Sequence, residues 1–122
     1  MIKLWKRLSS KEFQTMFQTG RFFSGPKLSI VVKVNFIPSR VGFTLKKGKK
    51  SSVERNYYKR LLREAFIDVQ FCLPDNWSVV LIANANKNKL NLDEIRFDLL
   101  HLIDLAKSSF TNQNENNIHL SH

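Results

Sequence analysis

Residues 40–69 read RVGFTLKKGKKSSVERNYYKRLLREAFIDV and are the most informative part of the chain. Its first six residues alternate, so that Val41, Phe43 and Leu45 share one side of the chain, which predicts a strand with that face toward the core. Residues 46–50 contain four lysines and one glycine and are expected to form a basic loop. The residues after this loop have the pattern of an amphipathic helix. The stretch therefore predicts a strand, a basic loop and a helix in succession.

The predicted helix begins at Ser51 and Glu54, which have the spacing of a capping box, and is expected to end near Val69, before Pro74. At 100° per residue, its cations and one asparagine share an arc of about 140°. The residues of this cationic arc are Arg55, Asn56, Lys59, Arg60 and Arg63. Like charges at i, i+4 destabilise an isolated helix by a few tenths of a kcal/mol per pair. A polyanionic partner that removes this repulsion is therefore favoured over a merely solvated surface.

Upstream of this stretch, the sequence predicts a short helix and a strand. Ser9 and Glu12 form a capping box for a helix that ends at Gly20, a residue expected to supply a left-handed stop. Residues 27–34 alternate and predict a half-buried strand, with Val31 on its polar face. This strand and residues 40–45 are expected to form a hairpin. Residues 21–24 are a further short strand candidate.

Downstream, residues 77–83 are a nearly continuous apolar run, as expected of a central strand that is covered on both faces. Asn91 and Glu94 predict the start of a last helix. Residues 111–122 are polar, rich in asparagine and aperiodic, and are expected to form a disordered tail. The predicted order is helix, two or three strands, helix, strand and helix, all in one domain over residues 1–110.

The charge of the 122-residue chain is divided unevenly along its length. Residues 1–63 hold 16 Lys and Arg against two acids, a net charge of +14, whereas residues 64–122 hold four against eight, a net charge of −4. Together they give the total of +10. Such segregation attracts phosphate to one region of the molecule. A nucleic acid is therefore the favoured partner, ahead of a membrane surface.

Several other classes of protein are disfavoured by the sequence. No run of about 18 apolar residues is present, and the first residues lack the apolar segment of a signal peptide. Cys72 is the only cysteine, so no internal disulfide is expected and a cytoplasmic location is the default. The histidines at 101, 119 and 122 show no metal-ligand spacing, and neither a Gly-rich phosphate loop nor a nucleophile elbow occurs. The sequence thus predicts no catalytic or metal site of its own.

Two phenylalanines of the first helix have two possible roles. Phe13 and Phe17 lie one turn apart, and this spacing is typical of a pair that packs into the core. Alternatively, the two rings stack on unpaired bases, with Lys27 and Lys33 beside them on a sheet face. Helical spacing alone favours the core over the stacking platform.

Three segments, RVGF at 40–43, KK at 46–47 and RNYYKRLLREAF at 55–66, resemble the protein subunit of bacterial ribonuclease P. The resemblance implies an α+β fold, an α/β sandwich in the order α-β-β-β-α-β-α. It further implies a left-handed βαβ crossover, against the usual right-handed rule, in a fold shared with a domain of a ribosomal protein. In this family a catalytic RNA with its Mg²⁺ ions removes the 5′ leader of precursor tRNA. The implied partners are that RNA and precursor tRNA, with no DNA or membrane partner.

The resemblance also implies site residues. The cationic arc matches the family helix that meets the catalytic RNA, together with the loop lysines Lys46, Lys47, Lys49 and Lys50. Phe13 and Phe17 match aromatic residues of the leader-binding cleft, and Lys27 and Lys33 are expected beside them. Tyr57, where the family usually has arginine, falls on the apolar side and receives no RNA contact.

Two other functions stay open at the level of the sequence. A basic structural RNA-binding protein, similar to a small ribosomal protein, has the same charge pattern. An autonomous nuclease that uses His101 with His119 and His122 is a weaker alternative. The first would bind RNA without assisting an RNA catalyst, and the second would cleave RNA with no partner.

Overall fold

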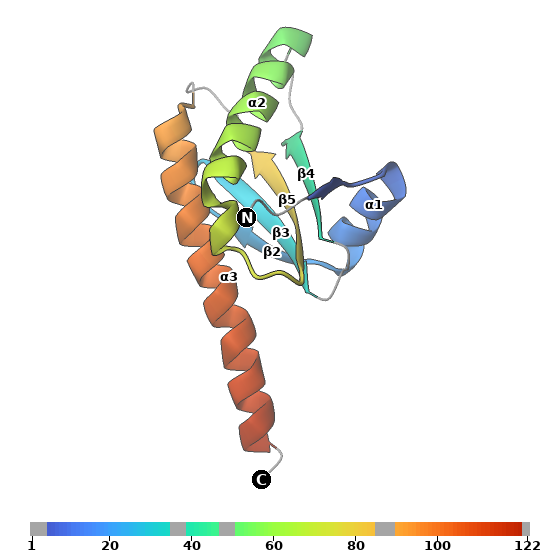
Figure 1. Ribbon diagram of the computed structural model, residues 1–122, viewed down its shortest axis with the longest axis vertical. Helices are drawn as coiled ribbons and strands as arrows, with labels where there is room; N and C mark the ends of the chain where they lie inside the picture. Colours follow the sequence, from blue (N-terminus) through green and yellow to red (C-terminus); the bar gives the residue numbers. More distant parts are fainter. Residues whose placement is uncertain (1–4, 35–38, 47–50, 85–89, 121–122) are drawn as a thin grey trace.

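The structure is a computed structural model (Figure 1). It describes residues 5–34, 39–46, 51–84 and 90–120, and in the last of these segments it describes side chains as far as residue 111. The chain alternates between short strands and helices. In chain order the elements are β1 (Lys6–Arg7), α1 (Ser10–Thr19), β2 (Arg21–Ser24), β3 (Leu28–Val34), β4 (Arg40–Leu45), α2 (Ser52–Val69), the 3-10 turn η1 (Gln70–Cys72), β5 (Trp77–Ala83) and α3 (Leu92–Leu120). The predicted α+β fold in a single domain is confirmed.

The strands form one mixed sheet in the order β1-β4-β5-β3-β2. β5 pairs with β4 in parallel and with β3 in antiparallel orientation. The predicted hairpin between residues 27–34 and 40–45 is therefore wrong, because β5 lies between these two strands. The apolar side chains of β5 are buried most fully in the central position, where both faces of the strand are covered. The antiparallel hairpin forms instead between β2 and β3, around Gly25 and Pro26.

The connection from β4 through α2 to β5 is the βαβ unit of the fold. β4 and β5 are adjacent and parallel. In Figure 1 both arrows point up, α2 lies in front of the sheet, and β5 lies to the left of β4, which makes the crossover left-handed. The expected exception to the right-handed rule is therefore present.

The sheet is covered on both faces by helices. α2 and α3 pack on one face, over the larger core, which includes Ile30, Leu62, Leu81 and Leu102. α1 covers the other face, over a smaller cluster of Leu8, Met16, Val31 and Val80. Val31 is thus fully buried. The prediction of a polar face for this position is wrong, because the alternation of β3 does not reveal the helix that covers it.

The helix starts are as predicted, whereas one helix stop is not. Ser9 caps α1 with a complete capping box, and the Ser51 hydroxyl accepts from the Glu54 N–H at 3.2 Å at the start of α2. Gly20 has φ −78° and ψ 167°, an extended and not a left-handed conformation. Glycine is needed there for space, since a Cβ would lie 2.5 Å from both the Met16 carbonyl oxygen and Val31 Cγ1.

The last helix is longer than predicted. The Asn91 side chain accepts from the Glu94 N–H at 2.9 Å at its start, as the sequence indicates. α3 then continues to Leu120, so the expected disordered tail is helical from residue 111 to residue 120. No glycine or proline interrupts residues 92–120, and extending an existing helix costs far less than starting one. Within the described part of the chain, no helix is long and apolar enough to span a membrane.

Candidate nucleic-acid interface

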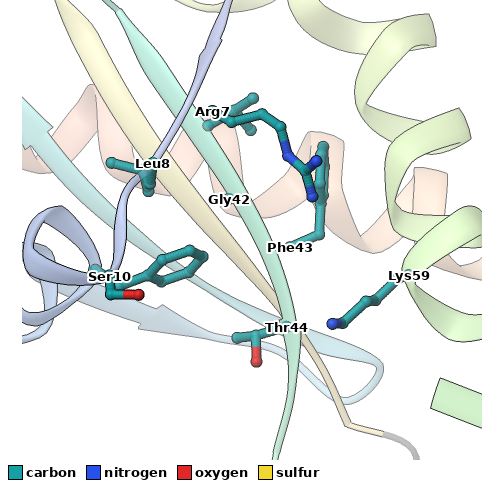
Figure 2. A pocket seen from close by; sticks show the side chains of 9 residues that line it. Arg7, Leu8, Ser10, Gly42, Phe43, Thr44 and Lys59 are labelled. Carbon is teal, nitrogen blue, oxygen red and sulfur yellow. The ribbon is translucent and has the colours of Figure 1, made fainter. Parts of the chain in front are cut away.

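A cleft of about 370 Å³ straddles β4 and opens toward both α1 and α2 (Figure 2). It brings together residues from three separate stretches of the chain: β1 with α1, β4, and α2. The lining residues are Arg7, Leu8, Ser10, Phe13, Val41, Gly42, Phe43, Thr44 and Lys59. The cleft therefore joins an apolar floor, hydroxyl groups and two cations.

β1 places Arg7 at the rim of the cleft. This two-residue strand pairs in parallel with β4, where the Lys6 N–H donates to the Ser39 carbonyl and the Leu8 N–H to the Val41 carbonyl, both at 3.2 Å. Figure 2 shows the Arg7 side chain extending toward Phe43. The sequence does not predict this strand, because two residues are too few to show an alternating pattern.

Gly42 allows α1 to lie close to β4. A Cβ at this position would collide with the Phe13 ring and would lie 3.0 Å from Leu8 Cδ1. The ring of Phe13 therefore rests directly on the backbone of β4. Phe13 is half-buried: it packs against the smaller cluster, and its ring also lines the cleft.

The cationic arc of α2 lies beside the cleft and enters it at one residue. Asn56, Arg60 and Arg63 are exposed, and Arg55 is half-exposed. Lys59 is half-buried and lines the cleft. The Arg63 guanidinium lies 5.9 Å from the centre of the Phe43 ring, within the range of a cation–π contact. Lys59 thus joins the cationic arc to the cleft.

Phe66 is an apolar residue of α2 that lies close to the cationic arc. Phe66 falls beside the cations on a helical wheel, yet it is buried. Its ring makes edge contacts with Trp5, 5.0 Å away, and with Phe43, 5.9 Å away. These rings close the end of the sheet where β1 joins β4. Tyr57, as predicted, lies away from the arc and packs against Tyr58.

Three phenylalanine rings lie in a row from the cleft to the edge of the sheet. Phe13 and Phe17 stack with ring centres 6.3 Å apart and an angle of 21° between their planes. Phe17 stacks on Phe22 of β2, with ring centres 6.0 Å apart and an angle of 29°. Phe17 is 40% exposed and Phe22 is 52% exposed. We call Phe13, Phe17 and Phe22 the ring row. Phe22 is not among the residues that the sequence predicts for the site.

The predicted lysines occupy two different places. Lys33 Nζ donates to the Thr19 hydroxyl at 2.6 Å, so it lies at the end of α1, beside the ring row. Lys27 lies at the end of the sheet, where its Nζ is 3.7 Å from a carboxylate oxygen of Glu94. Lys46 leaves β4 at the same end, and its N–H donates to the Ala83 carbonyl. Lys47, Lys49 and Lys50 lie outside the described residues.

The carboxylate of Glu12, which precedes Phe13 in α1, is engaged by Ser9 and by the positive charge of Arg40. Glu12 accepts from the Ser9 N–H at 2.8 Å and lies 2.7 Å from Arg40 Nε. The Ser9 backbone bond, together with the Ser9 hydroxyl and the Arg40 charge, holds the pKa of Glu12 below its usual value of 4.5. None of the residues that line the cleft is acidic. This surface is therefore suited to a phosphate-bearing ligand.

Candidate catalytic or metal-binding groups do not gather at the cleft. Among the residues that the structure describes, no three His, Cys, Asp or Glu side chains are close enough to hold a metal ion. His101 is exposed on α3, which packs on the opposite face of the sheet from α1. The side chains of His119 and His122 lie outside the described residues.

Sequence comparisons relate the chain to a family of known proteins. The family model for ribonuclease P matches residues 3–107. The chain belongs to the ribonuclease P protein family. The ribonuclease P protein component of Alkaliphilus metalliredigens is 32% identical over 103 residues, which cover 84% of this chain and 93% of the relative. That of Lactococcus lactis subsp. lactis is 30% identical over 115 residues, 93% of this chain and 97% of the relative.

Solved structures of ribonuclease P proteins share the fold. The protein from Thermotoga maritima superposes with a TM-score of 0.69 at 23% identity, over 80% of this chain and 94% of the other. The Staphylococcus aureus protein also gives a TM-score of 0.69 at 23% identity, over 86% and 97% of the two chains. The mixed five-stranded sheet with three helices is thus the architecture of ribonuclease P proteins.

Proposed function

We propose that this ribonuclease P protein binds the catalytic RNA and places the 5′ leader of precursor tRNA, while the RNA carries out the cleavage. The RNA contact is the cationic arc of α2, extended by Lys46, Lys47, Lys49 and Lys50. The leader contact is the cleft with Phe13 and Phe17, flanked by Lys33, and with Lys27 at the end of the sheet. The observation that carries the proposal is the cleft across β4, because Lys59 of the arc and Phe13 of α1 line the same space.

The chemistry of this surface suits single-stranded RNA. Unpaired bases are bound by stacking on aromatic rings, and the backbone by cations that follow it. Phe17 presents an exposed ring, whereas Lys59 and Arg7 supply charge at the cleft. Ser10 and Thr44 also line the cleft, where their hydroxyl groups offer hydrogen bonds to a ribose or a base edge. A leader strand therefore finds both kinds of contact in one groove.

The described residues do not fit a protein-bound Mg²⁺ site. Mg²⁺ prefers oxygen ligands, above all carboxylates and phosphates. The cleft offers two cations and no carboxylate, and Glu12 is engaged by Ser9 and Arg40. We therefore assign Mg²⁺ to the RNA subunit and expect the protein alone to be inactive. The exposed, unbridged Cys72 is in keeping with a reducing compartment such as the cytoplasm.

Leader cleavage by ribonuclease P RNA at low Mg²⁺ concentration, with and without the protein, tests the proposal. We expect the protein to restore cleavage of precursor tRNA under conditions in which the RNA alone is slow. A protein that binds RNA tightly without raising the cleavage rate would be a structural RNA-binding protein instead. Cleavage by the purified protein after nuclease treatment removes trace RNA would indicate an autonomous nuclease, and removal of His119 and His122 would then abolish it.

A further inference from the structure

We infer that Phe22 forms an additional base-stacking position at the edge of the sheet, for leader nucleotides that extend beyond the cleft. This inference rests on the proposed function, because it assumes that a leader strand enters the cleft. It adds a site on β2, an element that the cleft itself does not include.

The position of Phe22 follows from the register of the sheet. β2 is an edge strand, and Phe22 pairs with Val31 of β3. Paired residues share a face of the sheet, and Val31 is buried beneath α1. The Phe22 ring therefore lies on the α1 face, where Phe17 covers one side of it and about half of its surface is left to solvent.

The ring row makes a continuous path from the cleft. Phe13 rests on Gly42 at the cleft, Phe17 follows on the surface of α1, and Phe22 is last. The three rings are close to parallel. The two exposed rings, Phe17 and Phe22, each offer apolar surface to a neighbouring base. A strand that leaves the cleft along this row reaches Phe22 only after it has passed Phe17.

The charges around the row also favour RNA. Lys33 lies at the adjoining end of α1, where it contacts Thr19. Glu12 is the only carboxylate on α1 and on the strand positions facing it within the described residues, and Arg40 neutralises it. A phosphate backbone beside the rings therefore meets attraction and no opposing charge.

The test uses the reconstituted holoenzyme and a nested set of leaders, from a length that fills only the cleft to one that passes the sheet edge. Affinities for these precursors and for mature tRNA are measured with the wild type and with Phe22→Ala. We expect unchanged affinity for the shortest leader and for mature tRNA, and a loss of about fivefold or more for long leaders. Phe22→Trp should restore the affinity, whereas Phe22→Leu, which keeps apolar bulk without an aromatic face, should not.

Matched controls distinguish failure of this inference from failure of the proposed function. Phe97→Ala removes a ring that is 78% exposed on α3, and should leave every affinity unchanged. If the wild type gains no affinity from any leader, the proposed function fails as well. If the wild type and Phe22→Ala gain equally at every length, or if mature tRNA loses as much as long precursors, only the inference is overturned. Should Phe22→Ala not fold, the comparison of Phe22→Leu with Phe22→Trp decides the question.

Discussion

Asp98 shows how one carboxylate fixes an end of the sheet. It lies on α3, is 5% exposed, and accepts from the backbone N–H groups of Lys27 and Leu28 at 3.0 and 3.2 Å. A Cβ on Gly25 would lie 2.5 Å from both carboxylate oxygens, so the turn between β2 and β3 needs glycine at this point. The tertiary contact therefore sets both the turn and the start of β3.

Replacing Asp98 should destabilise the whole protein. Asp98→Ala leaves two backbone donors without their acceptor, one of them buried, and should lower the free energy of unfolding by about 1–3 kcal/mol. Urea denaturation measures the change. Asp104→Ala, an exposed acid on the same helix, is the control and should stay within about 0.5 kcal/mol of the wild type. Equal effects of the two substitutions would contradict this role of Asp98.

Gly42 is the second position where one residue governs a larger feature. Gly42→Ala places a methyl group against the Phe13 ring and Leu8, so α1 must move away from β4. Overpacking of this kind typically costs about 1–3 kcal/mol of stability. We also expect weaker binding of leader-bearing precursor, because Phe13 leaves its place in the cleft. A variant with unchanged stability and unchanged affinity would show that α1 adapts freely.

At the scale of elements, the start of α1 should respond to acid. The pKa of Glu12 is lowered by the Ser9 backbone bond first, then by the Ser9 hydroxyl and the Arg40 charge. Because this pKa is lower in the folded state, Glu12 stabilises the fold at pH values above the usual pKa of 4.5. This stabilisation is lost as the pH falls through the folded-state pKa. The stability difference between wild type and Glu12→Gln should therefore shrink below pH 4.5.

Denaturant unfolding over a pH series tests this expectation. Arg40→Gln is the informative companion, because the Arg40 charge is the smallest of the lowering contributions. That variant should keep most of the pH dependence. A stability difference between wild type and Glu12→Gln that is constant across the series would rule out the capping carboxylate as its source.

The cationic arc of α2 should be visible in the salt dependence of RNA binding. Each phosphate contact that is lost reduces the slope of log K against log salt by about 0.7–0.9. Arg60→Ala and Lys59→Ala should each lower the affinity for ribonuclease P RNA and flatten this slope. Lys107→Ala on α3 removes the same charge away from the arc and should leave the slope unchanged. If the folded double variant of Arg60→Ala and Lys59→Ala keeps the wild-type slope, the arc is only a solvated surface and does not contact the RNA.

At the scale of the whole molecule, both helical layers depend on the same strand. Leu81 of β5 belongs to the core under α2 and α3, whereas the adjacent Val80 belongs to the cluster under α1. Leu81→Ala should lower stability by about 2–5 kcal/mol through a cavity. Because the sheet is shared, helical content and the signal of a probe on α1 should be lost in one transition. Separate transitions would show that α1 unfolds independently.

Local patterns in the sequence predict much of this fold. The capping residues Ser9, Ser51 and Asn91 mark three helix starts, because they act within a single turn. The helical period separates the cationic arc from the apolar side of α2, and the apolar run of β5 predicts its central position. These features depend on residues close together in the chain, and so a local pattern is sufficient to reveal them.

Other features depend on long-range packing, which local patterns do not show. The pairing of β3 with β5 instead of β4, the two-residue β1, and the stacking of Phe22 on Phe17 all join distant segments. No local period encodes which strand lies between two others, because every half-buried strand shows the same alternation. The cleft across β4 exists only once α1, β1 and α2 have packed around that strand, and this long-range packing makes the candidate site.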